Sequence, residues 1–344
     1  MTVGTPRPVA VARDRGDGRR DPLLWPEECL FAVALTLVAG LALVTGALSW
    51  AVIAASVVLV GALIAGLALS RRRRTAASGS VALDAAARAG GAARLARTVG
   101  GVARTAVPFL SCVVIYSSLR DITPELDFPL VDPALIEFDR AVFGGDVSRW
   151  LNDTLGSPAL TLFMAFCYLS YGLSQAAWAI SSYLRGHARE YHDFALAISI
   201  TAVVGYSGYV LVPGVGPHIY QTDVYADPLP GHDGSIGSAL DVITAVQGPA
   251  RDLFPSLHTA MTVVLMVYLW RDARRLFWWY LPIGLGLVLS TLYLRKHYAV
   301  DLLAGTALAV LAVVVAGRVN RWWYRPRADP PAGAARSFAP SPPR

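Results

Sequence analysis

Residues 299–317 read AVDLLAGTALAVLAVVVAG, an apolar run with a single charged residue, Asp301. A helix needs roughly 20 mostly apolar residues to cross the hydrocarbon core of a membrane. A carboxylate costs free energy in such a run, and an ionisable residue in a membrane span is therefore a functional hypothesis by default. This stretch predicts a membrane helix with a functional aspartate near its first turn.

Similar apolar runs recur along the chain of 344 residues, of which 55% are hydrophobic and 16% charged. This composition is too apolar for an ordinary soluble domain. We expect an all-α polytopic membrane helix bundle with about eight transmembrane helices. We expect the first of these helices to stay in the protein and not to be cleaved as a signal peptide, because its apolar run is longer than that of a signal peptide. The predicted spans are 30–48, 51–70, 102–119, 159–183, 194–212, 255–270, 276–294 and 299–317.

The arginines indicate the orientation of these spans, because short cytoplasmic loops carry the excess of Lys and Arg. One assignment puts both termini and the arginine-rich loops near residues 71–74, 185–189 and 271–275 in the cytoplasm. The loops on the other side are mainly acidic. We therefore expect a multi-pass protein of the cell membrane whose active site is extracytoplasmic. The net charge of +6 is explained by this arrangement, and no nucleic-acid partner is expected.

The chain divides into five predicted regions. Residues 1–28 and 319–344 are expected to be disordered cytoplasmic tails, because they are rich in Pro, Arg and small residues. Residues 29–74 form a transmembrane hairpin, residues 75–101 a cytoplasmic linker with an amphipathic helix at 81–99, and residues 102–318 a six-helix core. Helical spacing of Val131, Leu135, Phe138 and Val142 also predicts an interfacial helix over residues 131–151.

Two polar clusters, residues 251–259 and 295–301, interrupt the apolar sequence at the same predicted membrane face. His297 and Asp301 are four apart, a spacing that puts both on one helix face. The carboxylate could then bind one imidazole nitrogen and leave the other free to attack. A purely structural alternative is that Asp301 pairs with Arg295, Lys296 or His297 to join helix ends.

The first cluster contains Phe254-Pro255-Ser256-Leu257-His258 at the predicted start of the sixth helix. Pro is well tolerated in a first helical turn, and the free N–H groups there are suited to a phosphate. The chain from His258 to His297 is long enough to cross the membrane and return. We therefore expect the two histidines to face one another.

These residues resemble a known family. PSLH at 255–258 and YLRKHYAVDLLAG at 293–305 are similar to the second and third signature motifs of the type 2 phosphatidic acid phosphatase superfamily. The resemblance covers about residues 102–317. It implies that His297 attacks phosphorus to form a phosphohistidine, that Asp301 steadies His297, and that His258 protonates the leaving oxygen. No metal ligand set is visible and no cofactor is expected.

The sequence departs from the family pattern at two places. The first motif, a Lys followed by Arg-Pro, is absent: Lys296 is the only lysine, and PGVGPH stands at 213–218 instead. Ser290 is followed by Thr291 and not by Arg. This altered pattern is similar to the inositol phosphorylceramide synthase-like (inositolphosphotransferase) branch, where the acceptor is an alcohol. Other groups must then bind the phosphate, and the candidates are Ser256, Arg251, Arg295, Lys296 and His218.

The sequence thus predicts a membrane phosphotransferase that moves a phosphoryl-containing group from a membrane lipid to an alcohol such as inositol or another polyol. The alternative is a lipid phosphate or polyprenyl diphosphate phosphatase, with water as acceptor. A third possibility is a transporter or scaffold that has kept the fold. The oligomeric state stays open. Tyr168, Tyr171, Gln175 and Trp178 share one helix face and predict either a packing seam or a lipid groove.

Overall fold

The computed structural model describes residues 25–47, 91–232, 235–247 and 251–323, together with positions 53, 57, 60 and 61. All regular structure in these ranges is helical, which confirms the predicted all-α class. The helices are α1 (Pro26–Thr45), α4 (Gly91–Ile122), η1 (Thr123–Leu126), α5 (Asp132–Phe143), α6 (Val147–Leu155), α7 (Pro158–Leu169), α8 (Leu173–Leu184), α9 (Ala188–Leu211), α10 (Pro217–Tyr220), α11 (Ser235–Gln247), α12 (Leu257–Asp272), α13 (Arg274–Tyr293) and α14 (Ala299–Trp323).

Five described helical segments are long and apolar enough to cross a membrane, and the bent pair α7–α8 would make six. The five are Pro26–Thr45, Thr105–Leu126, Arg189–Leu211, Arg274–Tyr293 and Ala299–Trp323. Helix α12 has 16 residues. At 1.5 Å per residue it is about 24 Å long, shorter than a hydrocarbon core of roughly 30 Å. The predicted second span, 51–70, lies largely outside the described residues, and the predicted number of eight is not confirmed.

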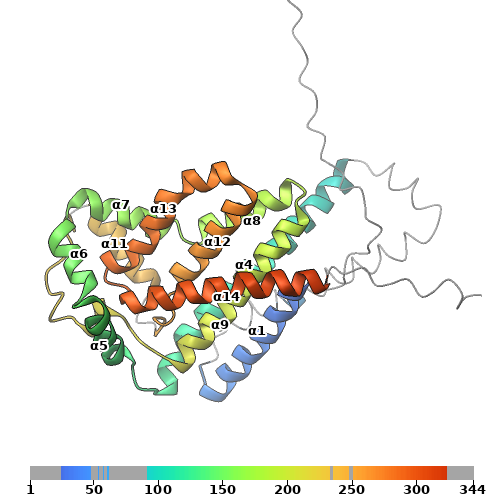
Figure 1. The fold of residues 1–344 in the computed structure, drawn as a ribbon. Coiled ribbons are helices and arrows are strands. Elements are labelled where there is room, and N and C mark those ends of the chain that lie inside the picture. The colour runs from blue at the N-terminus through green and yellow to red at the C-terminus, as the bar shows by residue number, and fades with distance from the viewer. Residues whose placement is uncertain are drawn as a thin grey trace, which may run out of the picture.

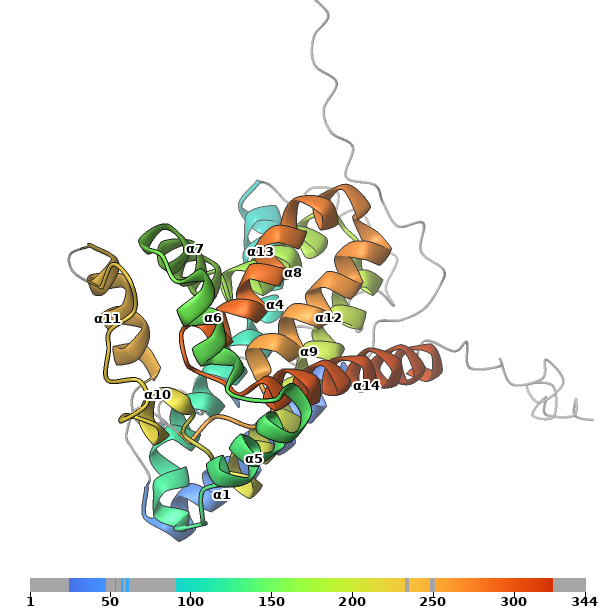
Figure 2. The ribbon, with the colours of Figure 1, turned by 60° about the vertical axis from the view of Figure 1, so that its left-hand side comes forward.

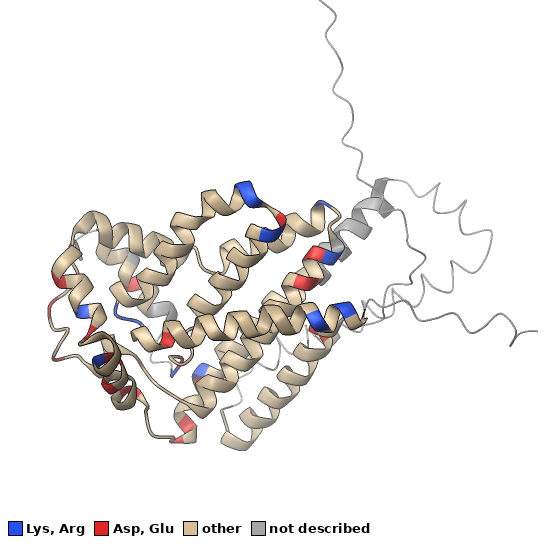
Figure 3. Ribbon diagram, viewed as in Figure 1, with Lys and Arg blue, Asp and Glu red and all other residues tan. Residues whose placement is uncertain are grey.

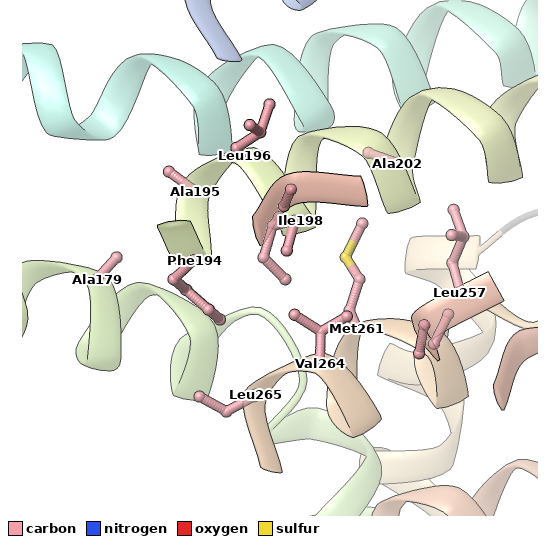
Figure 4. Close-up of a cluster of buried hydrophobic side chains, with 14 of the residues drawn as sticks. Ala179, Phe194, Ala195, Leu196, Ile198, Ala202, Leu257, Met261, Val264 and Leu265 are labelled. Carbon is pink, nitrogen blue, oxygen red and sulfur yellow. The ribbon is translucent and has the colours of Figure 1, made fainter. Parts of the chain in front are cut away.

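Helix α9 lies at the centre of the bundle, in contact with α1, α4, α8, α12 and α14 (Figure 1). Its Ala195, Ala197 and Ala202 are fully buried. Small side chains let helices approach closely, which is how membrane helices gain van der Waals packing. Figure 4 shows the resulting core, in which Phe194 and Ile198 of α9 lie beside Val264 of α12.

Helices α12 and α13 form an antiparallel hairpin that turns at Ala273. Helix α14 packs against α12 and α9. Gly305 of α14 makes the approach to α12 possible, because a Cβ atom at this position would collide with the carbonyl oxygen of Ser256. The hairpin and α14 thus bring the starts of α12 and α14 together.

The predicted fourth span, 159–183, is two helices and not one. Helix α7 begins where the Ser157 Oγ accepts from the Leu160 N–H over 3.3 Å, with Pro158 in the first turn. The helices α7 and α8 meet at an angle of 45° around Gly172, whose φ of 33° does not continue a helix. The bend places the end of α7 and the residues after it beside α12.

The predicted interfacial helix at 131–151 is also two helices. Gly144, with a φ of 78°, ends α5, and the Asp146 carboxylate caps α6 by accepting from the Arg149 N–H over 3.0 Å. Helix α11, which the sequence analysis did not predict, packs on α7. Residues 91–101 of the predicted linker form the beginning of α4, while residues 81–90 lie outside the described ranges.

Helices α5 and α6 lie at one end of the bundle with the start of α14 (Figure 1), and α10 joins them at that end (Figure 2). Acidic residues are most numerous around α5 and α6, whereas several basic residues lie at the far ends of α12, α13 and α14 (Figure 3). The segments with the predicted catalytic residues meet at the end marked by α5. We call it the site end.

Candidate active site

The two predicted catalytic histidines lie next to each other at the site end. Their ring centroids are 5.8 Å apart, and the ring planes meet at 64°. His258 stands in the first turn of α12, and His297 lies in the short segment between α13 and α14. The α12–α13 hairpin therefore returns the chain to the place from which it started, as the sequence predicts.

Asp301 is fully buried and lies against His297. Its Oδ2 is 3.3 Å from His297 Nδ1 and accepts from the Tyr298 N–H over 3.0 Å. Its Oδ1 has no hydrogen-bond partner among the described residues. The carboxylate thus contacts both one imidazole nitrogen and the backbone at the start of α14, and the other ring nitrogen, Nε2, is not involved in this contact.

Ser256 connects the two sequence clusters. Its backbone N–H donates to the Asp301 carbonyl oxygen over 3.3 Å. Its Oγ accepts from the Thr259 N–H over 3.3 Å as the N-cap of α12, and the residue is fully buried. A helix N-terminus is a favourable place for an anion, and His258 lies in the first turn at this one.

Two tyrosine rings contact the His258 ring, Tyr168 from α7 and Tyr171 from the break between α7 and α8. The Tyr168 ring stacks on the His258 ring at 4.6 Å and 28°, and the Tyr171 ring lies at 4.4 Å and 42°. His258 Nδ1 is buried and has no hydrogen-bond partner in the part of the chain that the structure describes. Gln175 and Trp178 are also buried, but they lie on α8, so the predicted seam packs inside the bundle and spans two helices instead of one.

Residues 213–218, here called the glycine loop, lie against the segment before α14. The His218 N–H donates to the Arg295 carbonyl oxygen over 2.9 Å. Gly216 has a φ of 81°, and a Cβ there would lie 2.5 Å from the Lys296 carbonyl oxygen. Only glycine permits this approach. The loop that replaces the first family motif is thus next to His297.

His218 of the glycine loop and the nearby Lys296 have strongly shifted pKa values. Burial lowers the pKa of Lys296 to about 8, although the Asp252 carboxylate opposes this shift. Burial, followed by the charge of Lys296, lowers the pKa of His218 to about 3. His218 Nδ1 has no described hydrogen-bond partner. At neutral pH the loop therefore presents a neutral imidazole beside a charged ammonium.

The two predicted arginine ligands have other partners. Arg295, at a left-handed φ of 60°, donates from Nε to Asn152 Oδ1 over 2.7 Å and from Nη1 to the Asp227 carbonyl over 2.7 Å. Arg251 donates from Nη1 to the Phe128 carbonyl over 3.2 Å. It lines a small surface hollow that also includes Asp252. Neither guanidinium is placed beside His297 by these contacts.

Two carboxylates of α5 that were not among the predicted site residues support the site. Asp132 Oδ1 accepts from the Gly216 N–H over 2.9 Å and from the Tyr298 hydroxyl over 3.0 Å, and its Oδ2 accepts from the Val215 N–H over 3.1 Å. Asp139 accepts from the N–H groups of residues 299 and 300, over 2.7 and 2.9 Å. The sequence signal that could have identified these two residues is the presence of acidic side chains on the buried face of an amphipathic helix.

The apolar face predicted for this helix is not the face that the structure buries. Phe138 and Val142 are 45% and 54% exposed, whereas Leu135 lies on the buried face with the two aspartates. The exposed apolar side chains remain available to a membrane surface, so the interfacial position of α5 stays a prediction. Within the described ranges, no group of three or more His, Cys, Asp or Glu side chains is arranged to hold a metal ion.

Comparison with known proteins identifies the family: the chain belongs to the PAP2 superfamily, whose sequence profile matches residues 133–315. It is also similar to a phosphoinositol dihydroceramide synthase of Bacteroides thetaiotaomicron. The identity is 25% over 232 residues, which span 60% of this chain and 73% of that protein. No solved structure matches the chain. The predicted superfamily and branch are confirmed, and the protein is a membrane enzyme of the lipid phosphotransferase and phosphatase type.

Proposed function

We propose that the protein transfers a phosphoryl-containing group from a membrane lipid to an alcohol, through a phosphohistidine at His297. The observation that carries the proposal is the buried His297–Asp301 pair, with Nδ1 and Oδ2 3.3 Å apart, facing His258. A nucleophile oriented by a carboxylate beside a second histidine can perform both halves of a transfer. The similarity to a synthase supports an alcohol as acceptor.

In the first step, the Nε2 lone pair of His297 attacks phosphorus, and the bond from phosphorus to the lipid oxygen breaks. His258 donates a proton to that oxygen, so that the lipid leaves as an alcohol. General acid catalysis of this kind contributes about 10²- to 10⁴-fold to a rate. Asp301 stabilises the positive charge that develops on the His297 ring.

The phosphate would lie between the start of α12 and the glycine loop. The charged Lys296 and the neutral His218 are the side chains best placed to bind its oxygens, with the N–H groups that follow Ser256. Charge stabilisation at transferring phosphoryl oxygens is the largest contribution in such reactions. We assign Arg295 a positioning role, because its Nε donates to Asn152 Oδ1 and its Nη1 to the Asp227 carbonyl.

In the second step, the hydroxyl oxygen of the acceptor attacks phosphorus while His258 takes the hydroxyl proton. The bond between phosphorus and His297 Nε2 then breaks and the enzyme is regenerated. An acceptor such as inositol or another polyol gives a transferase. Water as acceptor would give a lipid phosphate or polyprenyl diphosphate phosphatase with the same residues in the same roles.

We place the site on the extracytoplasmic face of the cell membrane, with both termini in the cytoplasm. The arginines at the far ends of α12, α13 and α14 support this orientation, because short cytoplasmic loops are enriched in Lys and Arg. Attachment of a membrane-impermeant thiol reagent to Asp223→Cys in intact cells would support it, provided that a variant without the native cysteines serves as background. Labelling only after lysis would contradict it.

The function is tested with purified protein in detergent and a set of radiolabelled lipid phosphates, phosphatidylinositol included. We expect a new phosphorylated product when an alcohol is supplied, and trapping of acid-labile label on the protein. His297→Ala should abolish both. The matched control is His232→Ala. His232 lies in an exposed loop, with its Nε2 4.0 Å from Asp241 Oδ1, and its loss should leave turnover unchanged.

Two results would contradict the proposal at different levels. Release of free phosphate at a rate that no alcohol reduces, without a new product, would identify a phosphatase. Full turnover by His297→Ala would exclude the phosphohistidine mechanism, both for a transferase and for a phosphatase.

A further inference from the structure

Helix α5 buries two carboxylates, those of Asp132 and Asp139, next to the candidate site. Asp132 is 0% exposed and Asp139 is 4% exposed. Residues seven apart lie on the same helix face, so both project from α5 towards the catalytic segments. Burying a carboxylate is costly unless its oxygens accept hydrogen bonds. Here every described acceptor bond of the pair comes from the glycine loop or from the start of α14.

Asp139 satisfies a specific need at the start of α14. The first N–H groups of a helix have no partner inside the helix, and a carboxylate there is also favoured by the helix dipole. Asp139 occupies the two N–H groups of residues 299 and 300. Asp301 stands in the same first turn and could reach these groups with its own side chain, since an aspartate readily caps its own helix.

In the structure the two aspartates divide the donors around this helix start between them. With Asp139 in place, the Asp301 carboxylate stays on His297 Nδ1 and on the Tyr298 N–H. Without Asp139, the two freed N–H groups would be buried and unpaired, and Asp301 would turn towards them. We infer that Asp139 is a positioning residue that keeps Asp301 on His297, and that Asp132 positions the glycine loop for the phosphate.

The role of Asp132 follows from its three partners. It accepts from two successive N–H groups of the glycine loop and from the hydroxyl of Tyr298, which follows His297 in the chain. The neighbouring Val131 N–H donates to the Pro213 carbonyl over 2.9 Å. Asp132 thus connects the loop that carries His218 to the segment that carries His297 and Lys296. Its loss should affect substrate binding more than the chemical step.

This inference rests on the proposed function of His297, and it is tested in the same assay with Asp139→Asn. Asparagine has one acceptor oxygen where the carboxylate uses two. We expect kcat to fall roughly 100-fold with little change in KM, the effect of a small displacement of a catalytic group. The decisive readout is a double-mutant cycle with Asp301→Asn.

If Asp139 acts through Asp301, the double variant should be no slower than Asp301→Asn alone. A merely structural role would instead give independent losses that multiply. Asp139→Glu, which keeps the carboxylate, should recover most of the activity. If the Asn variant does not fold, the smaller loss in Asp139→Glu must likewise vanish in the Asp301→Asn background.

The second half of the inference is tested with Asp132→Asn. This variant should raise KM at least tenfold while changing kcat less. Asp139→Asn should show the opposite pattern, with a lower kcat and a nearly unchanged KM. Glu137→Gln removes a carboxylate from the exposed face of the same helix and should leave both constants unchanged. Equal behaviour of all three variants would overturn the inference.

Failure of the inference and failure of the proposed function are distinguishable. If His297→Ala is inactive while Asp139→Asn matches the wild type, only the positioning role is wrong. If His297→Ala retains its activity, the mechanism fails for reasons unrelated to α5.

Discussion

Gly305 of α14 faces the carbonyl oxygen of Ser256 at the start of α12, with no room for a side chain between them. This contact sets the distance between the helix that carries His258 and the helix that carries Asp301. The separation of the two catalytic elements is therefore fixed by a backbone contact.

Gly305→Ala should force α12 and α14 apart. Overpacking of this kind costs about 1–3 kcal/mol of folding free energy, and activity should fall at least tenfold. The matched control is Gly317→Ala on the same helix, where a Cβ would meet only the Arg321 side chain at 3.5 Å. It should be neutral or slightly stabilising, because Ala favours a helix. Thermal unfolding and turnover are the measurements, and equal behaviour of the two variants would refute the prediction.

Lys296 should give the enzyme a falling activity at alkaline pH. Burial lowers its pKa to about 8, so the ammonium is charged below this pH and neutral above it. If the charge binds phosphate, kcat/KM should decrease as pH rises through about 8. Lys296→Arg should move this decrease to higher pH, because arginine stays protonated.

The matching loss-of-charge variant is Lys296→Gln, which should lower kcat/KM at neutral pH by about 10- to 100-fold, the value of a charge-assisted hydrogen bond. His218→Gln should leave the alkaline decrease in place, because burial lowers the pKa of His218 to about 3 and the imidazole does not titrate there. An identical pH profile for wild type and Lys296→Arg would show that another group causes the decrease.

The Tyr171 ring should matter for catalysis more than its hydroxyl does. The ring lies 4.4 Å from His258, while the hydroxyl contacts only the Met261 sulfur in the described contacts. Tyr171→Phe should be nearly as active as wild type. Tyr171→Leu should lose about tenfold in kcat, since aromatic pairs contribute roughly 0.5–1.5 kcal/mol. Phe166→Leu, an exposed aromatic on α7, is the control.

Arg295 and Asn152 should behave as a single unit. The Arg295 guanidinium donates to Asn152 Oδ1, and the Asn152 amide donates to the Tyr293 carbonyl over 2.9 Å. Arg295→Gln and Asn152→Ala should each lower thermal stability, and the double variant should lose less than the sum of both. If Arg295 contacts phosphate directly, Arg295→Gln would raise KM far more than Asn152→Ala does.

The membrane class and the central residues could be predicted because their signals are local in sequence. Apolar runs reveal spans directly, and the four-residue spacing of His297 and Asp301 reflects the helical repeat. The pairing of these residues with His258 required only that one hairpin cross the bundle and return. The branch of the superfamily followed from two departures, at Thr291 and at 213–218.

The remaining features depend on contacts that the sequence does not display. The partners of Asp132 and Asp139 are backbone N–H groups, which have no residue type to recognise. The role of Arg295 depends on its left-handed backbone, which turns its side chain towards Asn152. Helix α11 and the bend at Gly172 were missed, because a short amphipathic helix and a single glycine are weak signals.

The α5 contacts also bear on where the smallest working unit of this chain begins. The PAP2 superfamily profile starts at residue 133, immediately after Asp132. A fragment cut at that boundary would contain both histidines, Asp139 and Asp301, yet it would lack the carboxylate that binds the glycine loop and the Val131 N–H that donates to Pro213. Recombinant fragments and domain exchanges within the family should therefore start upstream of Val131.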